Sequence, residues 1–499
     1  MNQLHSIAFI CIVFNSLIGQ TSLSAREVTI AGPSQLKALS SVRPGDIVTL
    51  KNGNWMDAAI SISKGGDARN PVVIRAEKPG GVIFGGSSTL EINAPFVTVD
   101  GLFFYKGSIA KDSLVRFNSH HGVVSNIAIV DCNPAAFETK YYWVFFSGDH
   151  NRVDRCYFKG KNNLDPLIGN AVEMSRHNSV TRSYFKNIPY NVGNGREVIR
   201  VWGSGKFDEP DEDGAFFNIE GNLFDHADGE GTEIISLKSN HNVVQHNTVI
   251  ATRGGINIRR GNYNTVKDNV VLGMNREGTQ GLRMSGQHNT VQGNYVSGCE
   301  YGIRVSSGEF IEKSLTPSYQ PDNKEKGKKN QVVRIPTYPQ NRQLTLTDNV
   351  MVGITGADLE IGFGYKNSWP ESQQILMPEE CLVKNNRFVR PNGGISVIGT
   401  IPDVSPPLDC FNFKPNQYDS NRVWGGQVTY APAAAGFRIQ NIPPNWSEPL
   451  EPLAKKTLTA EEVGPEWVIA LRRAGNFPME EMAASDRPVN PKNHDNKKK

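Results

Sequence analysis

The chain has 499 residues, enough for one large elongated domain or about three ordinary ones. Its 53 Lys and Arg residues nearly balance its 50 Asp and Glu residues, for a formal net charge of +3. This balance excludes a general nucleic-acid binder, whose basic excess dominates its surface, so any anionic partner must be held by locally placed cations. The 48 Gly residues and a hydrophobic fraction of 38% favour a soluble, turn-rich β protein.

The N-terminus has the features of an export signal. The apolar run over residues 7–18 is too short to cross a bilayer, and the small-residue stretch Ser22-Leu23-Ser24-Ala25 follows it. We therefore predict a signal peptide over 1–25, no membrane span, and a secreted or periplasmic mature protein. The cysteines beyond the leader are widely spaced, and we expect them to be buried small hydrophobes rather than disulfides or zinc ligands: Cys132, Cys156, Cys299, Cys381 and Cys410.

A repeat organises the middle of the chain. HNRVDRCYF at 150–158, HNSVTRSYF at 177–185, HNVVQHNTV at 241–249, YNTVKDNVV at 263–271 and HNTVQGNYV at 288–296 are alike, and FNIEGNLF at 217–224 is a variant. Each is a short alternating Val-rich segment bounded by Asn or Gly, which favours strands over helices. The leading Asn residues recur roughly every 20–27 residues, a solenoid period, and we place them at 151, 178, 218, 242, 264 and 289.

These observations predict a solenoid of short parallel strands, a parallel β-helix, with long loops on one face. Weaker copies of the pattern at 96–104, 344–353 and 381–389 extend the predicted β-helix domain over residues 26–430. Acidic residues 206–215 and charged residues 311–335 read as loops that grow from single coils. We expect a C-terminal cap or extension over 431–483, helical over 455–475, and a disordered basic tail over 484–499.

A second phrase, an aliphatic residue followed by a cation, recurs just before the Asn turns. Because side chains alternate along a strand, the aliphatic residues can face the core while the cations face outward. We expect these to form one stacked column: Arg200, Lys238, Arg259, Arg283 and Arg304. Like charges stacked at the ~4.8 Å rung spacing repel each other, so the column predicts a linear anionic ligand.

Oxygen-bearing residues lie near the same coils. Asn194 stands in NGRE, and Glu230 and Glu233 stand in DGEGTE. Carboxylate and amide oxygens suit a hard cation, of which Ca²⁺ is the natural candidate. Glu233 and Lys238 are five residues apart, so both can face one site only if a bend or bulge lies between them.

NGREVIR at 194–200, EIISLKSNHN at 233–242 and IRRG at 258–261 resemble the N-G-G-E-x-I-R, E-I-I-S-N-K-S-x-x-N and L-R-H-G phrases of polysaccharide lyase family 6, the group of alginate lyases and chondroitinase B. The resemblance implies a right-handed parallel β-helix fold. It also implies Lys238 as general base and Arg259 as companion acid in β-elimination from a uronate polymer. It also implies a Ca²⁺ site made by Asn194, Glu230 and Glu233, and substrate binding by Arg200 and Arg283. Arg260 and Arg304 complete the expected substrate-binding set.

Three departures from the family phrases stand out. Arg260 replaces the usual His, Leu237 replaces a common Asn, and two residues rather than one separate Glu230 from Glu233. The extra residue rotates one ligand unless the turn absorbs it.

Several readings stay open. Alginate is the favoured polymer, with dermatan sulfate as the alternative; a non-catalytic polysaccharide-binding β-helix would use the same cations without chemistry. A glycoside hydrolase is disfavoured, because the central coils show no repeated outward pair of acids.

Overall fold

The computed structural model describes residues 25–171, 175–191, 194–203, 213–310, 337–368, 372–402, 413–442 and 457–475. The predicted signal peptide before Ala25, most of the loops at 206–215 and 311–335, and the basic tail lie outside these residues, as does Cys410. No helix in the described part of the chain is both long and apolar enough to cross a membrane.

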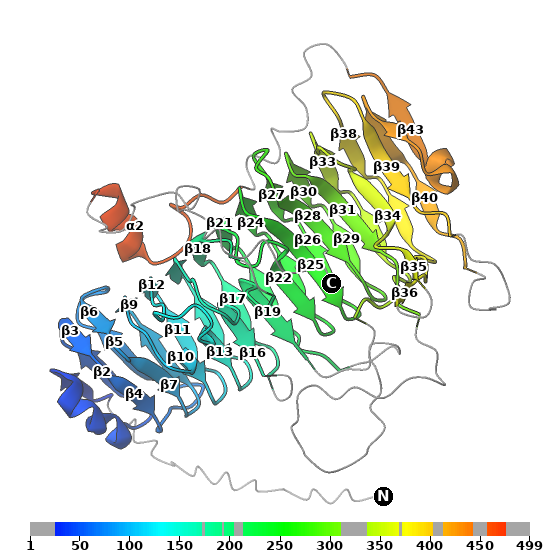
Figure 1. Ribbon diagram of the computed structural model, residues 1–499. Helices are drawn as coiled ribbons and strands as arrows, with labels where there is room; N and C mark the ends of the chain where they lie inside the picture. The colour runs from blue at the N-terminus through cyan, green and yellow to red at the C-terminus, as the bar shows by residue number, and fades with distance from the viewer. Residues whose placement is uncertain are drawn as a thin grey trace, which may run out of the picture.

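Three long parallel sheets run the length of the molecule (Figure 1), with 14, 13 and 14 strands. Each coil contributes one strand to each sheet, as when β19 (Ile199–Trp202) is followed by β20 (Asn218–Glu220) and β21 (Leu223–Ala227). We call the sheet that contains β20 the first sheet, and it runs from β1 (Glu27–Ile30) to β40 (Gln417–Asp419). The sheet that contains β19 is the second sheet. The sheet that contains β21 is the third sheet, and it runs from β3 (Gly53–Met56) to β43 (Phe437–Gln440). The predicted parallel β-helix is confirmed.

The second sheet positions the site described below. Its strands, in spatial order, are β4 (Ala59–Ile62), β7 (Thr89–Ile92), β10 (Asp112–Phe117), β13 (Tyr141–Phe146), β16 (Ile168–Asn170), β19, β22 (Glu233–Lys238), β25 (Gly254–Arg260), β28 (Thr279–Met284), β31 (Tyr301–Ser306), β34 (Leu359–Phe363), β39 (Ile395–Gly399) and β42 (Gln427–Val428).

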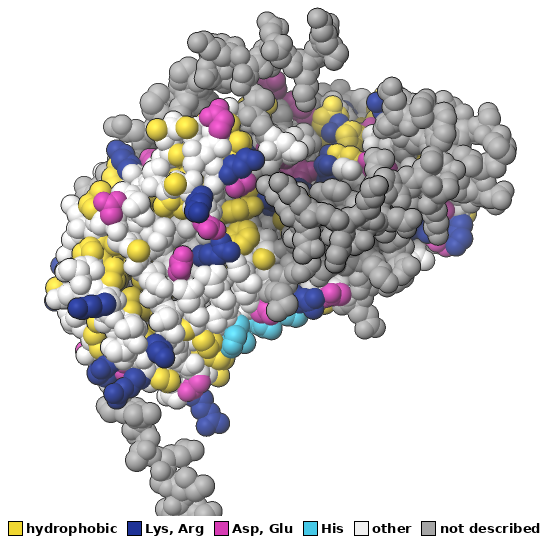
Figure 2. All heavy atoms as spheres, turned by 60° about the horizontal axis from the view of Figure 1, so that its bottom comes forward, with side chains coloured by type: hydrophobic (Ala, Val, Ile, Leu, Met, Phe, Trp, Pro, Cys, Tyr) yellow, Lys and Arg dark blue, Asp and Glu magenta, His cyan; other side chains and the backbone are white. Residues whose placement is uncertain are grey.

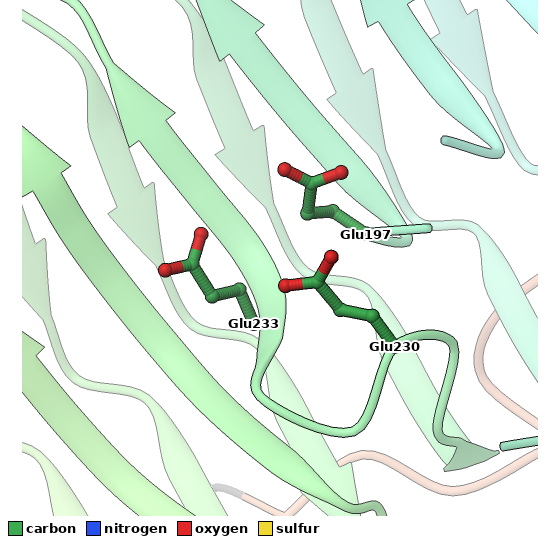
Figure 3. Close-up of side chains that lie close together, drawn as sticks. All are labelled: Glu197, Glu230 and Glu233. Carbon is green, nitrogen blue, oxygen red and sulfur yellow. The ribbon is translucent and has the colours of Figure 1, made fainter. Parts of the chain in front are cut away.

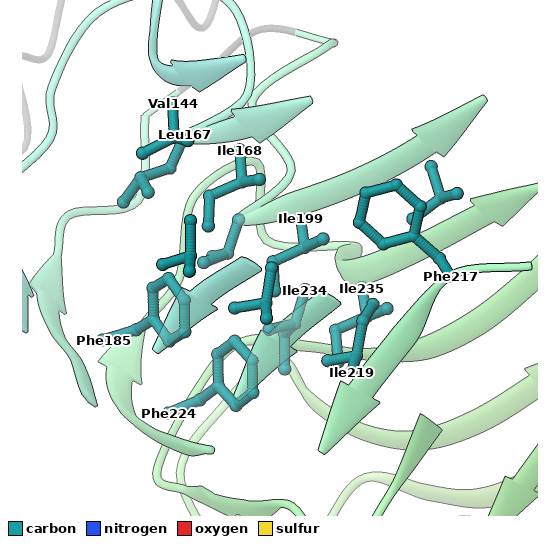
Figure 4. Packing of buried hydrophobic residues seen from close by; sticks show 14 of the residues in the cluster. Val144, Leu167, Ile168, Phe185, Ile199, Phe217, Ile219, Phe224, Ile234 and Ile235 are labelled. Atoms are coloured by element: carbon teal, nitrogen blue, oxygen red, sulfur yellow. The ribbon is translucent and has the colours of Figure 1, made fainter. Parts of the chain in front are cut away.

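Stacked apolar side chains fill the space between the sheets (Figure 4). Phe158, Phe185 and Phe224 occupy equivalent positions in successive coils, with ring centroids 5.0 and 4.7 Å apart. Ile199 and Ile235 stack in the same way from the second sheet. This continuous core explains the alternation in the sequence, because each strand sends every second side chain inward.

Two ladders of buried Asn side chains tie successive coils together. In the longer ladder, each Asn backbone N–H donates to the side-chain oxygen of the Asn in the next coil at 2.9–3.0 Å, through Asn222, Asn247, Asn269, Asn294, Asn349, Asn386 and Asn421. The other ladder contains Asn151, Asn178, Asn242, Asn264 and Asn289.

The predicted place of Asn218 in this second ladder is wrong. Asn218 pairs with Ser179 and Val243 in the first sheet. Phe217 takes the ladder position instead, and its backbone N–H donates to Asn242 Oδ1 at 3.0 Å. The phrase FNIEGNLF is therefore offset by one residue from the H-N-x-V repeats.

A stack of rings lies beside the second ladder, formed by the residue that precedes each ladder position. Seven successive contacts have ring centroids 4.6–5.1 Å apart, through Phe96, His121, His150, His177, Phe216, His241, Tyr263 and His288. All eight residues have φ between +49° and +61°, so the chain turns sharply at each. Figure 2 shows histidine side chains in a row on the surface.

The C-terminal part of the chain differs from the expected boundaries. β43 pairs with β41 (Asn421–Trp424), so the β-helix continues to Gln440 rather than ending at 430. Residues 457–475, with α2 (Glu466–Arg473), do not cap the last coil but lie against the outside of the third sheet. There Val463 and Val468 pack on Phe103 and Tyr157, and Trp467 Nε1 donates to Asn126 O at 2.8 Å.

The cysteines follow expectation where they are described. Cys132, Cys156, Cys299 and Cys381 are free and buried. Burial raises the pKa of the Cys132, Cys299 and Cys381 thiols to about 12, which keeps them protonated and unreactive at neutral pH.

Candidate active site

The predicted cations lie on the outer face of the second sheet, but in two rows rather than one column. Arg200 of β19 pairs with Ser236 of β22, and that row continues through Asn257 to Arg283 and Arg304. Lys238 pairs with Trp202 on one side and with Arg260 on the other. The single in-register column is therefore wrong.

Two irregularities in strand pairing cause this arrangement. The register between β22 and β25 shifts between Glu233 and Ile235 and again between Leu237 and Lys238. The first shift supplies the bulge that the five-residue spacing from Glu233 to Lys238 required. The second brings Arg260, instead of Arg259, opposite Lys238.

Three glutamates lie close together near the N-terminal ends of β19 and β22 (Figure 3). Glu197, Glu230 and Glu233 each offer a carboxylate oxygen, and these oxygens lie within 4.8 Å of one another. Glu197 and Glu233 are buried and Glu230 is partly buried. The sequence prediction included Glu230 and Glu233 but omitted Glu197, although Glu197 is the last residue of the NGRE motif.

Two of these carboxylates are paired with cations. Glu197 Oε1 accepts from Lys238 Nζ at 2.8 Å, and Glu197 Oε2 lies 3.6 Å from Arg200 Nη1. Arg259 and Arg283 both contact Glu233 Oε1, Arg259 at 3.3 Å. Lys238 and Arg259, the two residues predicted to act in catalysis, are thus each paired with a buried glutamate: Lys238 with Glu197 and Arg259 with Glu233.

The third carboxylate is electrostatically different. Burial and the neighbouring Glu197 and Glu233 charges raise the pKa of Glu230 to about 7, although the Gly195 and Arg196 backbone N–H groups bind its Oε2 at 2.8 and 3.2 Å. At Glu233, burial acts to raise the pKa, but nearby Arg283, Lys238 and Arg259 outweigh it and hold the pKa below its usual value.

This group has the donor set of a hard-cation site. Glu197 Oε2 is buried and has no hydrogen-bond partner among the described residues, and burial together with two neighbouring carboxylates raises the pKa of Glu230. Asn194 is exposed and lines the adjoining pocket, next to Gly195, which binds Glu230. The three glutamates could hold a metal ion.

A buried arginine holds the turns that carry the glutamates. The Arg196 guanidinium donates to Gly229 O at 2.8 Å and to Asn163 O at 3.2 Å. Burial lowers its pKa to about 10. Arg196 thereby connects the turn before Glu230 to the coil that precedes it.

An open pocket of about 610 Å³ adjoins the glutamates. Its lining combines five cations with one carboxylate and one aromatic ring, and comprises Lys140, Leu164, Asp165, Asn194, Gly195, Arg200, Trp202, Lys238, Arg259, Arg260 and Thr337. The pocket therefore brings together five of the predicted site residues. Such a lining suits a polymer that carries carboxylates.

The remaining predicted cations lie deeper. The side chain of Arg283 is 11% exposed, and Arg283 is bound to Glu233. Arg304 is 12% exposed, pairs with Glu360 at 3.1 Å, and lies between the Tyr301 and Phe363 rings. Arg304 is thus enclosed by its own protein neighbours and is not brought into the pocket lining.

Two aromatic residues at the site escaped sequence reasoning. The Trp202 ring lies 5.0 Å from Lys238 Nζ, and the Tyr338 ring lies 4.1 Å from Arg259 Cζ. Tyr338 comes from a distant segment, so only the folded chain reveals its contact.

Comparisons with known proteins agree with this geometry. The family model described as Chondroitinase B matches residues 33–306, more than half of the chain. A polysaccharide lyase family 6 enzyme from Pseudopedobacter saltans, Pedsa3628, is 37% identical, with a TM-score of 0.74 over 88% of this chain and 99% of that one. Among curated proteins, none matches the chain.

Two more distant structures share the fold. A mannuronic acid specific family 6 lyase from human gut microbiota is 23% identical, with a TM-score of 0.70 over 90% of this chain and 98% of that one. The family 6 alginate lyase AlyGC is 21% identical, with a TM-score of 0.68 over 88% of this chain and 57% of that one. From the family model and the 37% identical structure together, this chain belongs to polysaccharide lyase family 6.

Proposed function

We propose that the protein cleaves alginate by β-elimination, with Lys238 as the general base and Arg259 as its electrostatic partner. The observation that carries the proposal is that both side chains line one cationic pocket, and each is held from behind by a buried glutamate. This arrangement fixes two cations at a site that a uronate carboxylate can enter.

The proposed reaction needs one base and one source of charge stabilisation. After the Lys238 ammonium has released a proton to solvent, its neutral amine takes the C5 proton of a uronate, the C4–O4 bond breaks, and a C4=C5 double bond forms. Arg259 stabilises the negative charge that develops on the uronate, while water or a substrate hydroxyl supplies the proton that the leaving O4 takes. A guanidinium with a pKa above about 12 is a poor proton donor, which favours this role for Arg259.

Arg200 and Arg260 would bind carboxylates of neighbouring uronates, since both line the pocket. Arg283 would act mainly through Glu233, to which it is bound. The enclosed position of Arg304 gives its predicted role in substrate binding the weakest support.

A Ca²⁺ ion is proposed at Asn194, Glu230 and Glu233, with Glu197 added to that set. When bound, it would neutralise the substrate carboxylate and so make the C5 proton more acidic. Glu197 Oε2, which is buried and has no hydrogen-bond partner among the described residues, supports this assignment. We further propose that the protein acts after export, outside the cell or in the periplasm.

Alginate is favoured because the similar structures include enzymes named as alginate lyases. Dermatan sulfate is the alternative, since the matching family model is that of chondroitinase B. A polysaccharide-binding protein without activity is a third possibility, and it predicts binding without new chain ends.

The test is the ultraviolet absorbance of new unsaturated uronate ends. Wild type and Lys238→Ala are compared on alginate and on dermatan sulfate, each with and without a calcium chelator. Lys384→Ala is the matched control, because Lys384 is an exposed lysine of the first sheet, paired with Asp419. A rise on one polymer that depends on Lys238 but not on Lys384 supports the lyase and identifies the substrate. Binding with no rise on either polymer would leave only the non-catalytic reading.

A further inference from the structure

Trp202 brings three pocket cations to one ring. It ends β19 and pairs with Lys238 in the next strand. Its ring centroid lies 5.0 Å from Lys238 Nζ, 4.9 Å from Arg260 Cζ and 5.5 Å from Arg200 Cζ. The ring also lines the pocket. A tryptophan face attracts cations through its quadrupole, and more strongly where water is partly excluded.

The backbone of Trp202 is held on both sides by one buried side chain. Asn170 Oδ1 accepts from the Trp202 N–H at 2.8 Å, and Asn170 Nδ2 donates to the Trp202 carbonyl at 2.7 Å. Asn170 is only 3% exposed. These two hydrogen bonds fix the Trp202 backbone, and so the point from which its side chain leaves the strand.

Lys238 is held between this ring and a carboxylate. Its ammonium group contacts Glu197 at 2.8 Å and the Trp202 ring at 5.0 Å, and its side chain is 13% exposed. Lysine has a flexible four-carbon side chain, so with a single contact its nitrogen can still occupy several positions. Two contacts, one to a carboxylate and one to a ring, restrict the nitrogen more than either contact alone.

We propose that Trp202 is a positioning residue, which fixes the Lys238 nitrogen against Glu197 and aligns Arg200 and Arg260 beside it. This inference rests on the proposed function, because it assigns Trp202 a part in the same elimination. A base that is displaced by about 1 Å loses about 100-fold in rate, so removal of the ring acts on kcat through Lys238.

The experiment compares Trp202→Phe with Trp202→Leu, measuring kcat and KM for the release of unsaturated ends together with the thermal midpoint. Phe keeps an aromatic face and Leu does not. We expect Trp202→Leu to lower kcat about 10- to 100-fold, with a smaller change in KM. Trp202→Phe should keep most of the wild-type kcat. Tyr105→Leu is the matched control, because it removes a partly exposed ring beside Lys106 on the third sheet. It should leave both constants unchanged.

Trp202→Met covers the case in which the Leu variant fails to fold, because Met fills more of the space but lacks an aromatic face. An unchanged kcat in a folded Leu or Met variant overturns the proposal, as does a rise in KM alone, which would mean that the ring contacts sugar directly. Equal loss in the Phe and Leu variants also overturns it. If the wild type is active and Lys238→Ala is inactive, the proposed function stands whatever the Trp202 variants do. If the wild type is inactive, both the proposed function and the role of Trp202 are overturned.

Discussion

Lys238 Nζ and Glu197 Oε1 form an ion pair at 2.8 Å, with their side chains 13% and 1% exposed. A pair this deeply placed leaves an uncompensated charge when one partner is removed. Glu197 also belongs to the cluster of three carboxylates, so it connects the proposed base to the proposed metal site.

Replacement of Glu197 by Gln should therefore reduce kcat by about 10- to 100-fold, because the Lys238 nitrogen loses the charge that holds it. Steady-state kinetics on the identified polymer checks this expectation. Glu77→Gln is the control, since Glu77 makes an exposed pair with Lys51 at 2.6 Å, and exposed pairs contribute little. Equal kcat for wild type and Glu197→Gln would show that the ion pair has no part in the reaction.

Glu230 provides the test of the metal site. Glu230→Gln removes one of the three carboxylates, so Ca²⁺ should bind at least about tenfold more weakly, as measured by calorimetry on the free protein. Bound Ca²⁺ should also raise the thermal midpoint of the wild type, and the variant should lose most of that rise. Glu220→Gln, on the first sheet, is the control. Undiminished affinity in Glu230→Gln would place any Ca²⁺ elsewhere.

The stacked rings predict a pH dependence of stability. Burial and the neighbouring His150 and His120 lower the pKa of His121, and burial and His150 lower that of His177. A folded-state pKa below the unfolded value, about 6.5, means that the unfolded chain binds more protons. The free energy of unfolding should fall as the pH drops below about 6.5.

His177→Phe checks this, because Phe216 already occupies the next place in the same stack. The variant should lose less stability than wild type between neutral and mildly acidic pH, as measured by urea unfolding at each pH. His246→Phe, a histidine outside the stack, controls for the loss of an imidazole elsewhere. Identical pH dependence of wild type and His177→Phe would contradict the account of the stack.

The C-terminal extension should contribute to stability rather than to catalysis. Trp467→Ala removes the ring that packs on Phe103 at 5.5 Å and the hydrogen bond to Asn126 O. We expect the free energy of unfolding to fall by about 2–3 kcal/mol, with kcat unchanged for the folded protein. Leu471→Ala, an exposed position on α2, should cost much less. Equal stability of wild type and Trp467→Ala would mean that the extension is only loosely attached.

The repeats in the sequence were enough to predict the fold, because each coil repeats its Asn turn and its alternating strand. They did not settle register. FNIEGNLF contains an Asn one position away from the ladder, and the ladder position is taken by Phe217, a buried core residue that gives no sign of this place in the sequence. The end of the β-helix was also missed, since β43 carries no Asn phrase.

The sequence predicted most residues of the site, but not how they are arranged. Alternation alone placed Arg259 in line with Lys238, whereas a register shift puts Arg260 there. Glu197 could have been found from the NGRE motif, since a carboxylate three residues before Arg200 lies at the same strand edge. Tyr338 could not, because its contact with Arg259 joins segments far apart in the chain.

The most direct test of the central claim is the mass of the products released from alginate by wild type and by Lys238→Ala. β-Elimination by Lys238 predicts oligosaccharides with an unsaturated end, each one water lighter than the hydrolytic product, from the wild type only. Saturated products, or equal amounts of unsaturated product from the two proteins, would contradict it.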